Sequence, residues 1–161
     1  MFYLHGLGHF HPENVIDNAF LESLDIGTSD EWIMERVGIR TRRTTLSLDY
    51  VRQTHNRDPR GALEASQYTN AQMAAPAARM ALARAGIQAS DIGLVLAGGC
   101  SAPWSLPAEA CICAAELGIE TQAIDMNSGC SSFATILHFV NAFRPEAMPD
   151  YILVLNPEGN T

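Results

Sequence analysis

The second half of the chain alternates apolar, strand-like runs with segments of helical spacing. Residues 92–99 are apolar on both faces, which is typical of a strand buried in a parallel sheet. Helical patterns lie at residues 107–117 and 130–143, and shorter strand-like runs lie at residues 122–126 and 151–155. This order predicts βαβ units, and therefore an α/β fold with a largely parallel sheet covered by helices.

The first half of the chain gives weaker signals. Residues 2–7 predict a short strand, and residues 17–24 predict a short helix with an acidic cap. Residues 28–38 have hydroxyl caps, acids in the first turn and a closing glycine, which predicts another helix. An alanine-rich helix is expected at residues 71–85, where Pro76 either kinks the helix or marks its true first turn.

Composition narrows the possible partners. With 161 residues, 47% of them apolar, the chain can build the core of one ordinary domain. A net charge of −8 argues against a nucleic-acid partner, because phosphate binding needs a basic face. Seven of the ten arginines nevertheless lie between residues 36 and 60. Residues 41–68 lack periodicity and predict a long irregular segment, so the basic stretch is either a solvated loop or a site for a phosphate-bearing ligand or an acidic protein.

The chain carries no obvious targeting or membrane segment. It has no run of 18 apolar residues, and its first residues lack the basic start and long apolar stretch of a signal peptide. We therefore expect a cytoplasmic protein with no membrane span. The four cysteines include no C-x-x-C pair, so in that compartment they are expected to stay reduced as thiols.

The strongest chemical signal lies in residues 122–137, which read QAIDMNSGCSSFATIL. An apolar strand turns through Ser128 and Gly129 and delivers Cys130 to the start of a helix. Backbone N–H groups at a helix start lack partners within the helix, so they favour an anion and can bind a developing oxyanion. The arrangement predicts that Cys130 is the nucleophile of covalent acyl chemistry, with a packed structural thiol as the alternative.

The other cysteines are weaker candidates for the nucleophile. Cys111 and Cys113 lie inside a small apolar helix pattern, where a thiol usually packs as a small hydrophobe. Cys100 follows two glycines at a strand end, so it is expected to line the core or a site rather than to react.

The histidines predict neither a metal site nor a catalytic base. Three of them share strand parity near the N-terminus: His5, His9 and His11. Nearby glycines and a proline interrupt any regular strand, and no carboxylate or cysteine completes a ligand set, so no metal is expected. His138 follows Cys130 by eight residues on the same predicted helix, about 12 Å along an axis that rises about 1.5 Å per residue, and is too far away to be its base.

A second candidate site lies near the N-terminus. Trp32 is placed four residues before Arg36 on one helical face, with Arg40 nearby. An indole face beside guanidinium groups can stack a nucleobase and hold its phosphates. Core or edge packing is the other interpretation of a tryptophan on an amphipathic helix.

Several motifs together resemble the ketoacyl-acyl carrier protein synthase III group of thiolase-fold condensing enzymes. Residues 28–43, TSDEWIMERVGIRTRR, are similar to the N-terminal signature of that group, and residues 4–12 to its first strand and turn. Residues 85–96 and 107–111 match family segments, and residues 124–133 match the nucleophile segment. The resemblance runs from end to end and implies a thiolase-like layered fold of αβαβα type, of which this chain supplies the N-terminal half.

The resemblance also implies a reaction and its site. Cys130 is expected to take an acyl group from a coenzyme A or acyl carrier protein thioester, and the acyl group then condenses with a malonyl-type thioester to give CO2 and a 3-oxoacyl product. No metal or other cofactor is expected. Thr28, Trp32 and Arg36 are expected to bind the coenzyme A nucleotide, and Arg40 to contact an acidic carrier protein. The alternatives are a non-catalytic partner half, or an acyltransferase or thioesterase that uses the cysteine without condensation.

Three further expectations concern one position of the family pattern and two departures from it. Leu106 aligns with a family position that reaches across a dimer interface to limit the acyl pocket, so a homodimer is expected. The assisting histidine and asparagine of the family come from its second half, so they are expected from a longer polypeptide or a separate C-terminal chain; otherwise this half lacks condensing activity. Residues 44–68 are an insertion relative to the fatty-acid initiators and, with the serines around Cys130, suggest a specialised branch in secondary metabolism.

Overall fold

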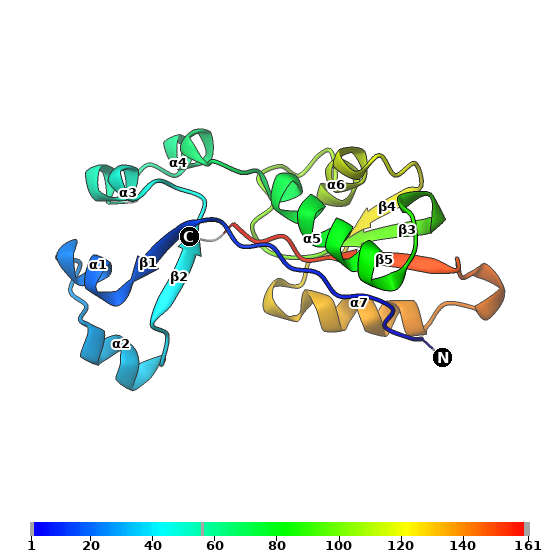
Figure 1. Cartoon of the computed structure of the whole chain (residues 1–161), viewed down its shortest axis with the longest axis horizontal. Helices are drawn as coiled ribbons and strands as arrows, with labels where there is room; N and C mark the ends of the chain where they lie inside the picture. Colours follow the sequence, from blue (N-terminus) through cyan, green and yellow to red (C-terminus); the bar gives the residue numbers. More distant parts are fainter. Residues whose placement is uncertain (1, 56, 160–161) are drawn as a thin grey trace. The chain divides into compact units, whose positions relative to one another are not determined.

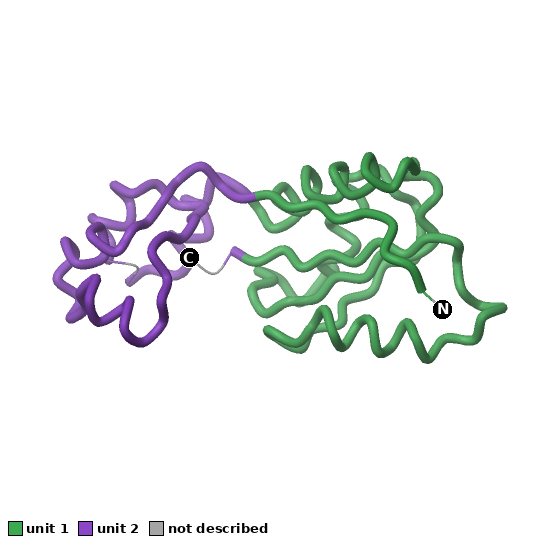
Figure 2. The backbone as a smooth tube through the Cα atoms, turned by 60° about the horizontal axis from the view of Figure 1, so that its bottom comes forward, with its two compact units in different colours: residues 1–10, 69–158 green, residues 11–68, 159–161 purple. Residues whose placement is uncertain are grey.

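The computed structural model describes residues 2–55 and 57–159, which fall into two compact units (Figures 1 and 2). Of these residues, unit 1 contains 2–10 and 69–158, and unit 2 contains 11–55, 57–68 and 159. Chain length alone favours one domain, whereas the backbone forms two units because the second one packs around a small core of its own.

Unit 1 is built on a parallel sheet whose strand order is β4 (Gln122–Asp125), β3 (Ile92–Ala97), β5 (Tyr151–Leu155). In this register Leu96 of the central strand lies opposite Ile124 on one side and Val154 on the other. All residues of β3 except Gly93 are buried, as expected for a strand paired on both edges and covered on both faces. The predicted α/β arrangement is confirmed.

Helices cover both faces of this sheet (Figure 1). The helical elements of unit 1 are α5 (Asn70–Ala85), α6 (Glu109–Leu117), α7 (Ser132–Asn141) and the 3-10 turns Ala89–Asp91, Gly129–Ser131 and Pro145–Ala147. Val95 of β3 packs with the small side chains of α5 and α6 on one face. Leu94 and Leu96 pack with Ile136 and Val140 of α7 on the other. One strand therefore contributes to two separate cores.

The ends of α5 are defined by side-chain and glycine signals. Thr69 and Gln72 form a capping box at its start, and Gly86 ends it with a left-handed φ of 71°. Pro76 lies inside the helix, so the alternative that it marks the first turn is wrong. With 16 residues α5 is the longest helix in the described chain, and no helix there is long and apolar enough to cross a membrane.

The start of α6 takes its cap from a neighbouring strand. Ala108 precedes the helix and has no side-chain acceptor, and Asp125 at the end of β4 fills that role. Its two carboxylate oxygens accept hydrogen bonds from the amides of Glu109 and Ala110, each at 2.8 Å. Negative charge is stabilising at a helix start, so this contact joins the end of β4 to the beginning of α6.

Residues 2–10 form no regular secondary structure, so the strand predicted at residues 2–7 is wrong. The segment lies against α5, and it comes so close that a Cβ at Gly6 would overlap the main chain of that helix. Arg84 of α5 donates a hydrogen bond to the Leu7 carbonyl at 2.8 Å. The Leu7 carbonyl is thus bonded by a helix side chain and not by the main chain of a neighbouring strand.

Unit 2 combines a small antiparallel sheet with short helices among its described residues. Its elements are β1 (Asn14–Asp17), α1 (Asn18–Ser23), α2 (Asp30–Arg36), β2 (Thr41–Thr44), α3 (Leu48–Thr54) and α4 (Pro59–Ala65). The helices predicted at residues 17–24 and 28–38 are confirmed, and their caps are Asp17 and Ser29. Ile16, Phe20 and Leu24 form the buried core of this unit.

The irregular segment predicted at residues 41–68 contains β2, α3 and α4 instead. Local caps start both helices: Ser47 accepts from the amide of Tyr50, and Asp58 accepts from the amide of Gly61. Each helix has seven residues and buries none of them. No apolar repeat therefore marks them in the sequence, which is why periodicity misses them.

Replacing Asp125 by Ala should lower the free energy of unfolding by about 1 to 2 kcal/mol, because two amides at the start of α6 lose their acceptor. Urea unfolding followed by circular dichroism measures the change. The matched control is Asp150→Ala, which removes an exposed carboxylate just before β5 and should shift stability by about 0.5 kcal/mol or less. Equal effects of the two substitutions would contradict the role given to Asp125.

Candidate active site

The candidate site lies where the three parallel strands end. The segments that leave β3, β4 and β5 all start from the carboxyl edge of the sheet, which is where open α/β sheets bind their ligands. Cys130 belongs to the segment after β4, and Cys100 to the segment after β3. The sequence prediction that these thiols follow strand ends is confirmed.

A close approach at the end of β3 fixes the start of α7. A Cβ at Gly98 would lie 2.7 Å from the Cβ of Ser132 and 2.8 Å from the carbonyl oxygen of Met126. The Met126 amide also donates to the Ala97 carbonyl at 2.7 Å, which continues the β3–β4 pairing one residue beyond the strand. Because position 98 is glycine, the helix that follows Cys130 can rest directly on the strand end.

The turn between β4 and α7 is sharp. Gly129 has a φ of 55°, in the left-handed region that glycine adopts without strain. Cys130 is the middle residue of the 3-10 turn Gly129–Ser131, and α7 begins at Ser132. The helix predicted at residues 130–143 therefore starts two residues later and ends at Asn141, while Cys130 stays exposed on the turn.

Hydroxyl groups on both sides of Cys130 hold this turn together. Ser132 accepts from the Ser128 amide at 2.8 Å and donates to the Gly129 carbonyl at 2.8 Å. Ser131 donates to the Ser128 carbonyl at 2.7 Å, and Thr135 donates to the Ser128 hydroxyl at 3.2 Å. The thiol therefore sits on a turn that is braced by side-chain hydrogen bonds rather than on a loose loop.

Some backbone amides near the thiol are already used within the turn. The amide of Ser131 donates to the Ser128 carbonyl at 3.2 Å, and the amide of Ser132 donates to the Gly129 carbonyl. These two groups are not available to an oxyanion while the turn is intact. Ser131 and Ser132 are therefore not expected to contribute their amides to an oxyanion site.

Burial separates Cys113 from the other thiols. Cys113 is fully buried in α6, and burial raises its pKa to about 12, with the charges of Glu109, Asp125 and Glu116 adding to the effect. It is therefore protonated and unreactive at neutral pH, as expected for a packed thiol. The same expectation is wrong for Cys111, which is exposed.

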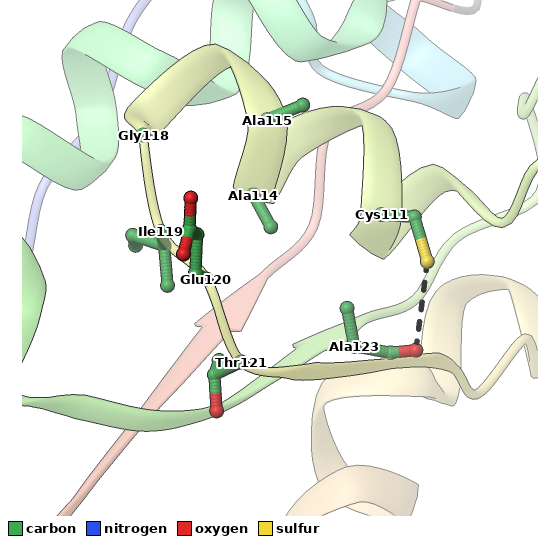
Figure 3. Close-up of a pocket in the computed structure, with 8 residues that line it drawn as sticks. All are labelled: Cys111, Ala114, Ala115, Gly118, Ile119, Glu120, Thr121 and Ala123. Carbon is green, nitrogen blue, oxygen red and sulfur yellow. Dashed lines mark hydrogen bonds between the residues drawn. The ribbon is translucent and has the colours of Figure 1, made fainter.

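Cys111 is exposed because it lies on the side of α6 that faces an open hollow (Figure 3). The hollow is lined by residues of α6, by the segment that leads into β4, including Glu120, and by Ala123 of β4. The Cys111 thiol points to the Ala123 carbonyl at a distance of 3.7 Å. Neither Cys130 nor Leu106 lines this hollow, so it is separate from the candidate nucleophile.

A carboxylate organises the loop that carries Cys100. Glu158, which follows β5, accepts hydrogen bonds from the Cys100 amide at 2.9 Å and from the Ser101 hydroxyl at 2.6 Å. The Cys100 thiol lies 3.7 Å from the same carboxylate. This thiol is exposed at the sheet edge, which agrees with a residue that lines a site.

The residues predicted to bind a nucleotide belong to unit 2. Trp32 is 47% exposed, and the Arg36 guanidinium carbon lies 5.0 Å from the centroid of its ring. Arg36 also forms an exposed ion pair with Glu35 at 3.1 Å. The structure thus brings Trp32 and Arg36 together as an exposed cation and indole pair, as the helical spacing predicts.

Thr28 and Arg40 flank this pair along the chain. The Thr28 hydroxyl is buried and has no hydrogen-bond partner among the described residues, while Ser29 provides the cap of α2. An unpaired buried hydroxyl is costly and marks a position where a polar partner would be stabilising. Arg40 is exposed, whereas Arg42 and Arg43 bind Asn18 and two main-chain carbonyls. Part of the basic stretch is therefore structural.

Two further predictions concern Leu106 and the histidines. Leu106 lies in the loop after β3 and is the most exposed large apolar residue, at 84%. His5 packs edge to face on Tyr151, with ring centroids 5.4 Å apart. Within residues 2–55 and 57–159 no group of three potential metal ligands occurs.

Comparison with known proteins shows which enzymes the chain is similar to. No protein-family model matches the chain. A β-ketoacyl-acyl carrier protein synthase III from Sulfurovum sp. (strain NBC37-1) is 32% identical over 154 residues, which cover 94% of this chain and 39% of that protein. Another from Bordetella petrii is 34% identical over 158 residues, which cover 95% of this chain and 42% of that protein. The chain is homologous to the β-ketoacyl-acyl carrier protein synthase III enzymes.

Solved structures of the synthase III group have the same fold. The crystal structure of 3-oxoacyl-acyl carrier protein synthase III from Aquifex aeolicus VF5 matches with a TM-score of 0.75 and 29% identity, over 94% of this chain and 42% of that one. The predicted resemblance and thiolase-like fold are thereby confirmed. The chain spans about two fifths of the length of the synthase III relatives it matches.

Several residues that shape the candidate site are absent from the sequence predictions. The role of the hydroxyls around Cys130 could have been predicted, because serine and threonine near a helix start usually bond to local backbone groups. The role of Glu158 could not, because the 58 positions that separate it from Cys100 leave no local pattern. Only the sheet brings those two residues together.

Alkylation of the native protein with iodoacetamide should modify three thiols, and unfolding should expose a fourth. Cys100, Cys111 and Cys130 are exposed, whereas Cys113 is buried with a raised pKa. Intact mass before and after urea treatment counts the modifications. A Cys113→Ala variant is the control and should take up three groups in both states; native modification of Cys113 at the rate of the other three would contradict its burial.

Proposed function

We propose that this chain carries the acyl-accepting site of a decarboxylating condensing enzyme of the synthase III type. The observation that carries the proposal is an exposed Cys130 on a braced turn at the carboxyl edge of a parallel sheet, in a chain homologous to such enzymes. The product would be a 3-oxoacyl thioester for fatty-acid or polyketide-like biosynthesis. No resident metal or organic cofactor takes part.

The first step is acyl transfer to Cys130. Its thiolate sulfur attacks the carbonyl carbon of an acyl-coenzyme A, a new carbon–sulfur bond forms, and the carbonyl electrons move onto oxygen. The bond to the coenzyme A sulfur then breaks, and the released thiolate takes up a proton. We assign the Cys130 amide as the donor from this turn to the transient oxyanion, because the next two amides are bonded within the turn.

The second step is condensation with a malonyl-type thioester. Its carboxylate leaves as CO2, and the electron pair of the broken bond forms an enolate. The enolate carbon attacks the acyl carbonyl, a carbon–carbon bond forms, and the bond to the Cys130 sulfur breaks to restore the thiolate. The family resemblance assigns two roles to a histidine and an asparagine of the second half: they activate the nucleophile and assist decarboxylation.

Unit 2 supplies the proposed coenzyme A contacts. The exposed Trp32 ring offers a stacking face for the adenine, and Arg36 offers a guanidinium for a phosphate once its exposed ion pair with Glu35 is exchanged. Thr28 carries a buried hydroxyl with no hydrogen-bond partner in the part of the chain that the structure describes. Arg40 is proposed to contact an acidic acyl carrier protein, because it is exposed and basic in a chain that is otherwise acidic.

Further partners follow from the resemblance. A second copy of the chain is proposed as the dimer partner, with Leu106 contributing to an acyl pocket across the interface. Its exposure of 84% supports this role, because so large an apolar surface is better stabilised against another surface. Residues 44–68, including α3 and α4, are proposed to be an insertion of a specialised branch.

Incubation with acetyl-coenzyme A should add one acetyl group to Cys130, because this thiol is exposed on a turn shaped for a nucleophile. Intact mass spectrometry and peptide mapping locate the adduct. Cys130→Ala should abolish it, whereas Cys100→Ala, which removes the other thiol at the sheet edge, should leave it unchanged. Acetylation that persists in Cys130→Ala would exclude this cysteine as the acyl carrier, and a failure of the parent chain to acylate would reject the proposal.

Trp32→Ala should raise the acetyl-coenzyme A concentration needed for half-maximal acylation by about tenfold, since stacking of one base on an aromatic ring contributes about 1 to 3 kcal/mol. The maximal acylation rate should change little, because Trp32 does not touch the reacting atoms in this proposal. Ile26→Ala is the control, since it removes another exposed apolar side chain of unit 2. Equal half-saturation in Trp32→Ala and the control would remove Trp32 from the nucleotide site.

A further inference from the structure

A buried polar pair closes the loop that joins β3 to α6. Asn70, the first residue of α5, donates to the Ser101 carbonyl at 3.1 Å and to the Glu109 carboxylate at 3.3 Å. Ser101 lies near the beginning of the loop, and Glu109 is the first residue of α6 at its end. One side-chain amide therefore bridges both ends of a loop, although Ser101 lies 31 positions after Asn70 along the chain.

The environment of this bridge makes it difficult to replace. Asn70 and Glu109 are each only 7% exposed. Burial raises the pKa of the Glu109 carboxyl, and the hydrogen bond from Asn70 opposes that shift, while the nearby charge of Asp125 adds to it. Without Asn70, the buried carboxylate would lose the amide that donates to it, which is an unfavourable arrangement.

Each end of the loop is also tied to a different strand. At the first end, Glu158 after β5 binds the Cys100 amide and the Ser101 hydroxyl. At the second end, Asp125 at the end of β4 binds the Glu109 amide. Asn70 joins these two anchored ends, so the base of the loop is held as one unit.

The tip of the loop has the opposite character. Trp104 is 61% exposed and Leu106 is 84% exposed. Pro103 and Pro107 flank them, and each proline fixes one backbone φ angle. The loop thus holds two large apolar side chains in solvent on a fixed base and between two prolines. A more flexible loop could bury them against the protein.

We propose that Asn70 and Glu109 are positioning residues for acyl-chain selection. By bridging the loop base they hold Trp104 and Leu106 in one arrangement, and these two side chains form a preorganised apolar stop for the acyl chain. The inference rests on the proposed function, because the acyl chain that the tip meets is the one carried by the partner copy across the proposed dimer interface. It adds Trp104 to the residues that determine chain length and explains what keeps Leu106 in place.

The physical basis is preorganisation. A loop already held in its working arrangement does not lose further conformational freedom when it meets a ligand. If the apolar side chains at the loop tip were mobile, they could not discriminate between acyl chains, because a longer chain would displace them at little cost in free energy. Loss of the bridge is therefore expected to relax selection among acyl chains without removing the nucleophile.

Hydrogen exchange tests the bridge without depending on catalysis. Asn70→Val removes the donor, and Glu109→Ala removes the acceptor; both should increase exchange of the hydrogen-bonded amides at the loop base, those of Cys100, Glu109 and Ala110, at least fivefold relative to those of β3. Glu109→Gln keeps an acceptor oxygen for Asn70 and should exchange like the parent chain. Asn141→Val, at the exposed end of α7, is the matched control for the asparagine replacement. Unchanged exchange of the loop in both Asn70→Val and Glu109→Ala would overturn the bridge.

Acyl selection tests the consequence. The acylation rate of Cys130 is measured by intact mass with acetyl- and octanoyl-coenzyme A. Asn70→Val and Trp104→Ala should each raise the octanoyl rate relative to the acetyl rate by about tenfold, a change comparable to one or two methylenes of pocket contact. Glu109→Gln should keep the parent ratio, as rescue by a conservative change.

The outcomes separate this inference from the proposed function. If the parent chain acylates and the rate ratio is unchanged in Asn70→Val and Trp104→Ala, the selection role is wrong although the function stands. If Cys130 of the parent accepts neither acyl group, the function and the selection role are both rejected. The exchange measurement decides in that case whether the bridge still orders the loop.

Discussion

The burial of β3 on both faces is the constraint on which unit 1 depends. Its alternate side chains need two separate cores, so α5 and α6 must cover one face of the sheet and α7 the other. The strand can only reach its glycine end beside α7 if position 98 lacks a Cβ, because Ser132 and the Met126 carbonyl already occupy that space. The place of Cys130, two residues before Ser132, is a consequence of this packing rather than of the turn alone.

At the carboxyl edge of the sheet, the ends of β4 and β5 supply polar side chains to the segment that follows β3. Asp125, the last residue of β4, caps α6; Glu158 after β5 binds the loop after β3, and Asn156 donates to the Gly98 carbonyl at 2.8 Å. Buried or half-buried main-chain groups need such partners when no helix or strand continues. The same arrangement leaves the edge ordered before any substrate binds, which favours precise placement of a nucleophile.

The elements that local sequence patterns determine could be predicted. The strands after residue 90, the glycine-ended helices and the turn with Cys130 all carry signals within a few positions of one another. Sequence reasoning missed α3 and α4, which bury none of their residues, and the path of residues 2–10, which is set by contact with α5. It also missed the exposure of Cys111, because an apolar helix pattern does not reveal that one side of α6 faces an open hollow. The bridge from Asn70 to Glu109 spans 39 positions and exists only in the folded chain.

Closure of the loop base by Asn70 has a consequence for how such chains can diverge. Because the ends are joined independently of the tip, residues between them can be exchanged, inserted or deleted without disturbing the sheet. Doubling the length of a flexible loop costs only about 0.6 kcal/mol in closure entropy. The segment from Ala102 to Ala108 can therefore be replaced by another sequence while the strands, the helices and the thiol stay where they are.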